Sequence, residues 1–464
     1  MTLLAARPSS GAAPRREPAS RPAPRSAATI RVVAIADADS YVKWAAATLD
    51  AVDGIDPRML IVRTPLTVSR AQERTALAGT ALGAGEPAAR AVSRVSHEGI
   101  ATRLRTLQPD VVLIAGRGPF VRLVQREIDR LESRPVIVTG MPGISIPAQI
   151  GAVKYRQHSD LLVVHSLRER RAFAQLCRRV GTDLPLGLAT LPFARREPVA
   201  GRAGGTDLVF AAQAIVPREH EERRQLAEIL VAAAQAHPDR RVVLKLRSRE
   251  GENETHYERT PLVDLLRERP DNLVVSYAPM STALQTAEGL VTVGSTAAIE
   301  ALAMGVPVIA LDVFGVRKTL LNTVFRTSGL LGDADDVIAR RFRHPDPTWA
   351  ADNYFHDAAE STWWTQVIEL VEQRRRGTLA PRRVPSPRGG ALHAAFERKS
   401  VLGHEDRTVS GAFALAMGAP LAAGIVRLRR FRHRAAAHSW TDESGDVTVT
   451  PALHVDPIRR PACR

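Results

Sequence analysis

Short apolar runs alternate with amphipathic stretches from residue 30 onward. The first run, Ile30 to Ala36, is followed by a helical pattern through Trp44 and Leu49. Apolar runs of about four to eight residues are typical of strands buried on both faces of a parallel sheet. Further strands are expected at 59–62, 110–116, 135–140, 160–165 and 186–193, with helices around 68–80, 94–107, 119–132 and 166–180. This alternation predicts parallel βαβ units.

A second series of the same kind begins after a stretch rich in Arg, Pro and Gly at 194–206, which we interpret as a linker. Strands are expected at 208–213, 241–246, 273–275, 290–293 and 307–311, with helices around 218–236, 260–268, 297–304 and 356–375. The sequence therefore predicts an α/β protein with two Rossmann-like parallel-sheet domains, 30–193 and 207–375, that face a cleft.

Both ends of the chain have a different composition. Residues 1–29 are rich in Ala, Pro and Arg, and 376–464 are basic, so both are expected to be mostly disordered. The apolar segment 411–426 is followed by an Arg-rich stretch, 427–434. It is too short to span a bilayer and contains Pro420, so it either docks on an anionic membrane surface or is a packed or disordered tail.

The net charge of the chain bears on which partners it binds. The formal net charge is +15, and 59 of the 64 basic residues are arginines. Two explanations for this bias stay open. One is GC-rich coding, and the other is attraction to anionic substrates or to an anionic membrane surface. No basic stripe is interleaved with aromatics, so specific nucleic-acid binding is not expected. The N-terminus has no signal-peptide pattern, and Cys177 and Cys463 lie far apart, which favours a cytoplasmic protein.

The segment from Val293 to Ile309 carries the sharpest chemical pattern. Ser295 and Thr296 follow a predicted strand at the start of a helix, where unpaired N–H groups favour an anion. Glu300 lies one turn further on. The alternative interpretation is ordinary helix capping by Ser295.

Two basic residues lie at the end of a neighbouring predicted strand. Lys245 and Arg247 are placed to neutralise a leaving phosphate, because ligands of doubly wound sheets lie beyond the carboxyl ends of the strands. A solvated strand end is the alternative. Gln213 ends another strand of this domain and, with Glu300, is an expected donor contact. His256, in a polar loop, is a candidate acid or phosphate ligand.

The first domain offers carboxylates in the corresponding place. Asp37 directly follows the first strand and is the favoured base for an acceptor hydroxyl, although turn formation by Asp39 and Ser40 is an ordinary alternative. The expected acceptor contacts are Asp39, Ser40, Tyr41, Gly116, Arg117 and Met141. No metal-ligand spacing, dinucleotide fingerprint or phosphate loop is present.

Three stretches carry a family resemblance. Val293 to Ile309 resembles the donor-binding helix of GT-B glycosyltransferases, whose relatives include nucleotide-sugar 2-epimerases and capsule-type sialyl- and glycerophosphate transferases. Ala36 to Trp44, and Lys245 to Glu250 with Thr255 to Tyr257, resemble a narrower glycosyltransferase family of high-GC bacteria with unassigned substrate. The resemblance covers about 30–375. It implies a nucleotide-activated donor bound by the second domain, an acceptor bound by the first, and no essential metal or other cofactor.

One departure leaves the donor open. Capsule-type relatives often carry His-Pro after the strand that here ends in Lys245, and this chain has Arg247 there. The resulting hypothesis is a glycosyltransferase that acts on a glycan or lipid-linked acceptor in cell-envelope or capsule-type synthesis, in the cytoplasm or at the inner face of the plasma membrane. The alternatives are a nucleotide-sugar 2-epimerase and a catalytically inactive membrane-associated scaffold.

Overall fold

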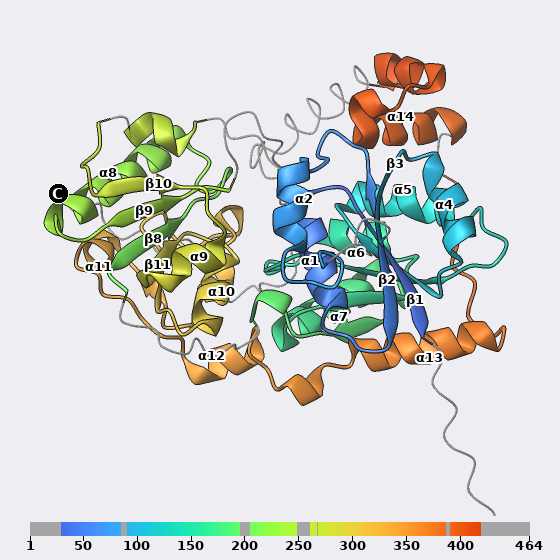
Figure 1. The fold of residues 1–464 in the computed structure, drawn as a ribbon, viewed down its shortest axis with the longest axis horizontal. Coiled ribbons are helices and arrows are strands. Elements are labelled where there is room, and N and C mark those ends of the chain that lie inside the picture. Colours follow the sequence, from blue (N-terminus) through green and yellow to red (C-terminus); the bar gives the residue numbers. More distant parts are fainter. Residues whose placement is uncertain are drawn as a thin grey trace, which may run out of the picture.

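The computed structural model describes residues 29–84, 91–194, 205–247, 260–266, 268–386 and 390–418. Within these ranges, two fully parallel sheets form, one of seven strands in the order β3-β2-β1-β4-β5-β6-β7 and one of six in the order β10-β9-β8-β11-β12-β13. Figure 1 shows the two domains side by side, with helices on the faces of each sheet. The predicted GT-B-like fold of two Rossmann-like domains is confirmed.

The first sheet is built from the apolar runs that the sequence displays. Its strands are β1 (Ile30–Ala36), β2 (Ile55–Val62), β3 (Val92–Val95), β4 (Val111–Ala115), β5 (Val136–Gly140), β6 (Leu161–Val164) and β7 (Leu186–Leu188). Its helices are α1 (Asp39–Leu49), α2 (Arg70–Leu77), α4 (Gly99–Leu107), α5 (Gly118–Ile128), α6 (Ile150–Arg156) and α7 (Leu167–Val180). The central strands are buried along almost their whole length, as expected when helices cover both faces.

The second sheet repeats the pattern. Its strands are β8 (Asp207–Ala211), β9 (Val242–Lys245), β10 (Leu273–Ser276), β11 (Ala287–Thr292), β12 (Val308–Leu311) and β13 (Leu331–Gly332). Its helices are α8 (His220–Ala236), α9 (Met280–Gln285), α10 (Ala297–Ala303) and α11 (Ala334–Ile338), and α12 (Pro347–Asp352) follows.

Several elements differ from the sequence-based expectation. The helix predicted around 94–107 begins only at Gly99, and the residues before it form the edge strand β3, which pairs with β2. The sequence Val92-Ser93-Arg94-Val95 is too short to display a clear two-residue period, so pairing with β2 decides its conformation. The strand expected at 186–193 is limited to Leu186–Leu188, and β13 was not anticipated.

The chain returns to the first domain after completing the second. Helix α13 (Trp363–Arg375), expected at the end of the second domain, lies along the first sheet, as Figure 1 shows. Trp363, Val367 and Val371 are buried with residues of β1, β4 and β5. The first domain is therefore assembled from two separate stretches of chain.

The tail is ordered over part of the stretch that we expected to be mostly disordered. Helix α14 (Gly390–Leu402) packs on α5, and Val401 and Leu402 join the apolar core around Phe120 and Leu123. A further helix covers 409–418, while 419–426, the remainder of the predicted apolar segment, lies outside the described residues. Among the described residues, no helix combines the length and apolar character needed to cross a bilayer.

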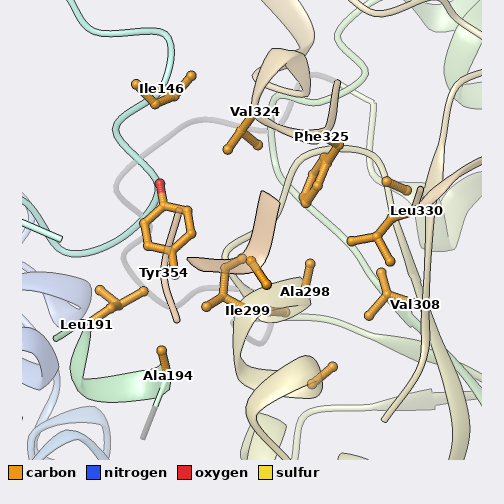
Figure 2. Packing of buried hydrophobic residues seen from close by; sticks show 14 of the residues in the cluster. Ile146, Leu191, Ala194, Ala298, Ile299, Val308, Val324, Phe325, Leu330 and Tyr354 are labelled. Atoms are coloured by element: carbon orange, nitrogen blue, oxygen red, sulfur yellow. The ribbon is translucent and has the colours of Figure 1, made fainter. Parts of the chain in front are cut away.

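The two domains share an apolar core at one edge of their interface. Figure 2 shows Ile146 and Leu191 of the first domain near Ile299 and Val324 of the second, with Tyr354 between them. The hydroxyl of Tyr354 donates to Glu169 Oε1 over 2.7 Å, and two backbone N–H groups also donate to this buried carboxylate. Burial raises the pKa of Glu169. This contact joins the segment between α12 and α13 to the first domain.

Candidate functional site

The carboxyl ends of the two sheets meet across the domain interface. Arg247, just beyond β9, donates from Nη2 to Oδ2 of Asp39, the first residue of α1, over 3.1 Å. The strand ends that the sequence analysis assigned to donor and acceptor therefore face each other. In a doubly wound sheet, this edge is where ligands bind.

Asp37 occupies the first-domain side of this interface. It directly follows β1 and is fully buried. Oδ2 accepts a hydrogen bond from Thr64 Oγ1 over 3.4 Å, while Oδ1 is buried and has no hydrogen-bond partner among the residues that the structure describes. Burial raises the pKa of Asp37 to about 6, against the opposing effects of Arg117 and Thr64. A carboxylate with such a pKa and an unused oxygen is suited to accept a proton near neutral pH.

Three other predicted acceptor residues lie near Asp37, and each makes a different interaction. The exposed Arg117 follows β4, next to β1 in the sheet, and its charge acts on Asp37. Burial raises the pKa of Tyr41, which hydrogen-bonds to the buried Arg156. Arg156 in turn donates to the carbonyl oxygen of Gly116 over 2.8 Å.

Glycine at position 116 is explained by packing. A Cβ atom there would lie 2.1 Å from the ring of Phe120. The half-buried Met141 packs against the interdomain apolar core, and Ser40 is half-buried in the first turn of α1. These two contribute surface at the interface, and neither makes a contact that marks it as reactive.

Lys245 occupies the second-domain side. It ends β9 and is buried, and its ammonium group donates to the carbonyl oxygen of Leu246. Burial, together with the charges of Lys43 and Arg247, lowers the pKa of Lys245 to about 8, although Glu300 and Asp39 act in the opposite direction. Three cations and two carboxylates therefore gather from both domains, with a net positive charge.

Lys43 is a residue of this site that the sequence analysis missed. It lies in α1, four positions after Asp39, and its ammonium group is 4.6 Å from the ring centroid of Phe193. Residues four apart share one helix face, so the Asp39–Lys43 spacing was the available signal. What that spacing does not reveal is that this face of α1 turns toward Lys245 of the other domain.

The hydroxyl-bearing residues before α10 are engaged within the protein. Ser295 Oγ accepts from the Ala297 backbone N–H over 3.2 Å, a local contact just before α10. The N-cap residue of α10 is Thr296, without a side-chain cap bond, rather than Ser295 as in the capping alternative. Thr296 Oγ1 accepts from the backbone N–H of Ile144 in the first domain, also over 3.2 Å. Thr296 therefore joins the two domains, and the loop after β5 covers it. This contact depends on domain packing and was not foreseen.

Of the remaining predicted residues, two lie in the described second domain and one lies outside the described residues. Gln213 Oε1 accepts from the Gly294 backbone N–H over 3.0 Å and so holds the turn that leads to Ser295. Glu300 is half-buried in α10. His256, the second predicted catalytic residue, lies outside the described residues. Among the described side chains, no group of three His, Cys, Asp or Glu residues is placed to hold a metal ion.

Two Rossmann-like domains that meet at the carboxyl ends of their sheets, with a buried carboxylate on one side and cations on the other, define a GT-B-like glycosyltransferase. The family model described as "Putative glycosyltransferase (DUF6716)" matches residues 32–370, well over half of the chain. The chain belongs to this family, and glycosyl transfer is its general activity. No curated protein matches the sequence.

The comparison with solved structures finds matches at low sequence identity. A protein named as a putative UDP-N-acetylglucosamine 2-epimerase from Listeria monocytogenes is 12% identical, with a TM-score of 0.49, and the match covers 77% of this chain and 100% of that one. UGT73P12 of Glycyrrhiza uralensis, complexed with glycyrrhetinic acid 3-O-monoglucuronide, is 10% identical, with a TM-score of 0.44 and coverage of 87% and 100%.

Proposed function

We propose that this protein transfers a glycosyl group from a nucleotide-activated donor to an acceptor hydroxyl, with the donor phosphates at Lys245 and Arg247 and the hydroxyl at Asp37. The observation that carries the proposal is the arrangement of Asp37 and Lys245 on opposite sides of one interdomain site. A base and a phosphate-binding cation are the two groups that such a transfer requires.

The chemical step follows from these positions. Asp37 accepts the proton of the acceptor hydroxyl while the oxygen of that hydroxyl bonds to the anomeric carbon of the donor. The bond from that carbon to the phosphate oxygen breaks, and its electron pair leaves with the nucleotide. Lys245, Arg247 and Lys43 offset the charge that builds on the phosphate. Because Lys245 is largely removed from water, its interaction with this charge is stronger than it would be in bulk solvent.

Arg247 connects donor binding to the relative position of the domains. It pairs with Asp39 across the interface. The phosphate oxygens of the donor compete with a carboxylate for the same guanidinium group, so donor binding at Arg247 is expected to exchange one partner for the other.

The proposal includes a location and an acceptor type. We propose a cytoplasmic enzyme that works at an anionic membrane surface in cell-envelope or capsule-type synthesis, on a glycan or lipid-linked acceptor. Support comes from the helix at 409–418, where Val409, Phe413 and Met417 are more than half exposed, and from the Arg-rich sequence at 427–434. Exposed apolar residues beside basic sequence favour adsorption to anionic lipid.

The test is a donor screen with the full-length protein. UDP-, GDP-, CMP- and CDP-linked sugars are added singly and the shift in melting temperature is measured. A true donor at a hundredfold excess over its dissociation constant should stabilise the protein by about 2.7 kcal/mol. Lys245→Ala should abolish the shift. If no donor stabilises the wild-type protein, the proposal is wrong. If UDP-GlcNAc alone is converted to its 2-epimer, the epimerase alternative is correct.

A further inference from the structure

A cavity lies between α5 of the first domain and α14 of the tail, apart from the site at the domain interface. Its volume is about 360 Å³, within the size range of small-molecule sites. Its lining includes the arginines Arg117, Arg122 and Arg126, which form a basic wall, and apolar side chains of α5 and α14. The family match ends at residue 370, so the α14 wall lies outside the region that defines the family.

The basic wall is held in a fixed arrangement. Glu397 of α14 pairs with Arg122 at 3.1 Å and with Arg126 at 2.9 Å. Arg122 also stacks on Tyr155, with its guanidinium carbon 4.6 Å from the ring centroid. Arg117 makes no ion pair with any residue that the structure describes. Three cations against one carboxylate leave the wall positive, which complements an anionic ligand.

Apolar side chains also line the cavity. Phe120 and Leu123 of α5 and Phe396 and Val401 of α14 belong to the lining, together with the polar His393 and Ser400 of α14. The ring of Phe396 is backed by the helix at 409–418, because a Cβ atom on Gly418 would lie 2.5 Å from it. A cavity lined by both apolar and basic side chains fits a ligand with a hydrocarbon part and a negative charge.

The cavity lies beside the proposed catalytic base. Ala36 pairs with Ala115 in the sheet, so Asp37 and Arg117 follow adjacent strand ends. The turn after α14 approaches the same edge, since Glu405 pairs with Arg63 at 3.6 Å. Arg63 immediately precedes Thr64, whose hydroxyl donates to Asp37. The Arg117 end of the cavity is therefore next to the site where the acceptor hydroxyl is proposed to react.

We propose that the cavity between α5 and α14 binds an amphiphilic anion, a hydrocarbon chain with a phosphate or carboxylate head, and that this molecule carries the acceptor hydroxyl. The chain lies against Phe396 and Val401, and the head lies at Arg117. This inference rests on the proposed function for the role of Asp37, and it names the acceptor class as lipid-linked.

Binding of dodecyl phosphate to the full-length protein, measured by isothermal titration calorimetry below the critical micelle concentration, tests the inference. Wild-type protein should bind it at least tenfold more tightly than either inorganic phosphate or neutral dodecyl maltoside. Arg117→Ala and Phe396→Ser should each weaken binding at least tenfold. Leu392→Ser is the matched control, because Leu392 is an exposed residue of α14 away from the cavity, and it should have no effect.

The outcomes separate this inference from the proposed function. Equal binding of dodecyl maltoside, or unchanged binding by both cavity variants, overturns the cavity as an amphiphile site. Arg117 is exposed, so its substitution is not expected to unfold the protein even if Phe396→Ser does. If the donor shift persists and a water-soluble hydroxyl acceptor is glycosylated while dodecyl phosphate does not bind, the cavity inference fails alone. If dodecyl phosphate binds and no donor does, the proposed function fails alone.

Discussion

Arg247 at the end of β9 reaches Asp39 at the start of α1, with 3.1 Å between Nη2 and Oδ2. Both side chains are substantially exposed, so the ion pair itself contributes only about 0–1 kcal/mol to stability. Its significance is positional. It brings the residue after a second-domain strand into contact with the helix that follows Asp37, at the place where we propose that donor and acceptor meet.

Arg247 is expected to bind phosphate once a nucleotide enters. Arg247→Ala should raise the dissociation constant of the matching nucleoside diphosphate about tenfold, which is about 1.4 kcal/mol. Asp39→Ala is the matched control, because it removes the competing carboxylate and should not weaken binding. Calorimetric titration at low and high salt measures both. Tighter nucleotide binding by Arg247→Ala would contradict the assigned role.

Substitution of Asp37 should separate activity from stability. Asp37→Asn keeps the shape of the side chain but removes the base, so kcat should fall by roughly 10²–10⁴. Burial raises the pKa of Asp37 from 3.8 to about 6, so the folded state binds this proton more tightly than the unfolded state.

The stability cost of the buried Asp37 charge is therefore absent below pH 3.8 and fully present above about pH 6. At pH 7.5 the Asn variant should be more stable than wild type by up to about 3 kcal/mol, and the difference should vanish near pH 4. Urea unfolding at both pH values checks this. A variant that is less stable at pH 7.5 would indicate that the carboxylate has a stabilising partner.

The pH dependence of kcat/KM should be bell-shaped. Activity should rise with pH through about 6 as Asp37 loses its proton, and fall through about 8 as Lys245 loses its positive charge. Lys245→Arg keeps a cation at all accessible pH values. It should retain partial activity and lose the alkaline decline, whereas an unchanged alkaline limb would exclude Lys245 as its source.

The buried hydrogen bond between Tyr354 and Glu169 should stabilise the domain junction. Tyr354→Phe removes the donor from a carboxylate that stays buried, so the free energy of unfolding should fall by about 1–3 kcal/mol. Arg171→Ala, which breaks a more exposed ion pair between α7 and Asp352, is the control and should cost less than about 1 kcal/mol. Equal losses in both variants would argue against a special role for Tyr354.

Features set by local pattern could be predicted from the sequence. Asp37 was found because it follows a fully apolar strand, and Lys245 because it ends another. The roles of Thr296 and Lys43 depend on contacts between residues more than 100 positions apart, which no local periodicity encodes. The loop at Ile144 satisfies the Thr296 hydroxyl only after the two sheets have packed together.

The tail helix α14 illustrates the same limit. Its sequence has no strong apolar face of its own, and its contact with α5 combines the burial of Val401 and Leu402 with the pairing of Glu397 to Arg122 and Arg126. Composition alone therefore favoured disorder. When a helix is stabilised by contacts with another element, its own sequence does not predict that it forms.

The return of α13 to the first sheet has a consequence for engineering. A chimaera that exchanges donor specificity by replacing everything after residue 206 would also replace Trp363, Val367 and Val371, and the acceptor half would lose the packing partners of its own core. Exchangeable modules in this protein must be excised with two cuts, so that α13 and α14 remain with the half that they complete.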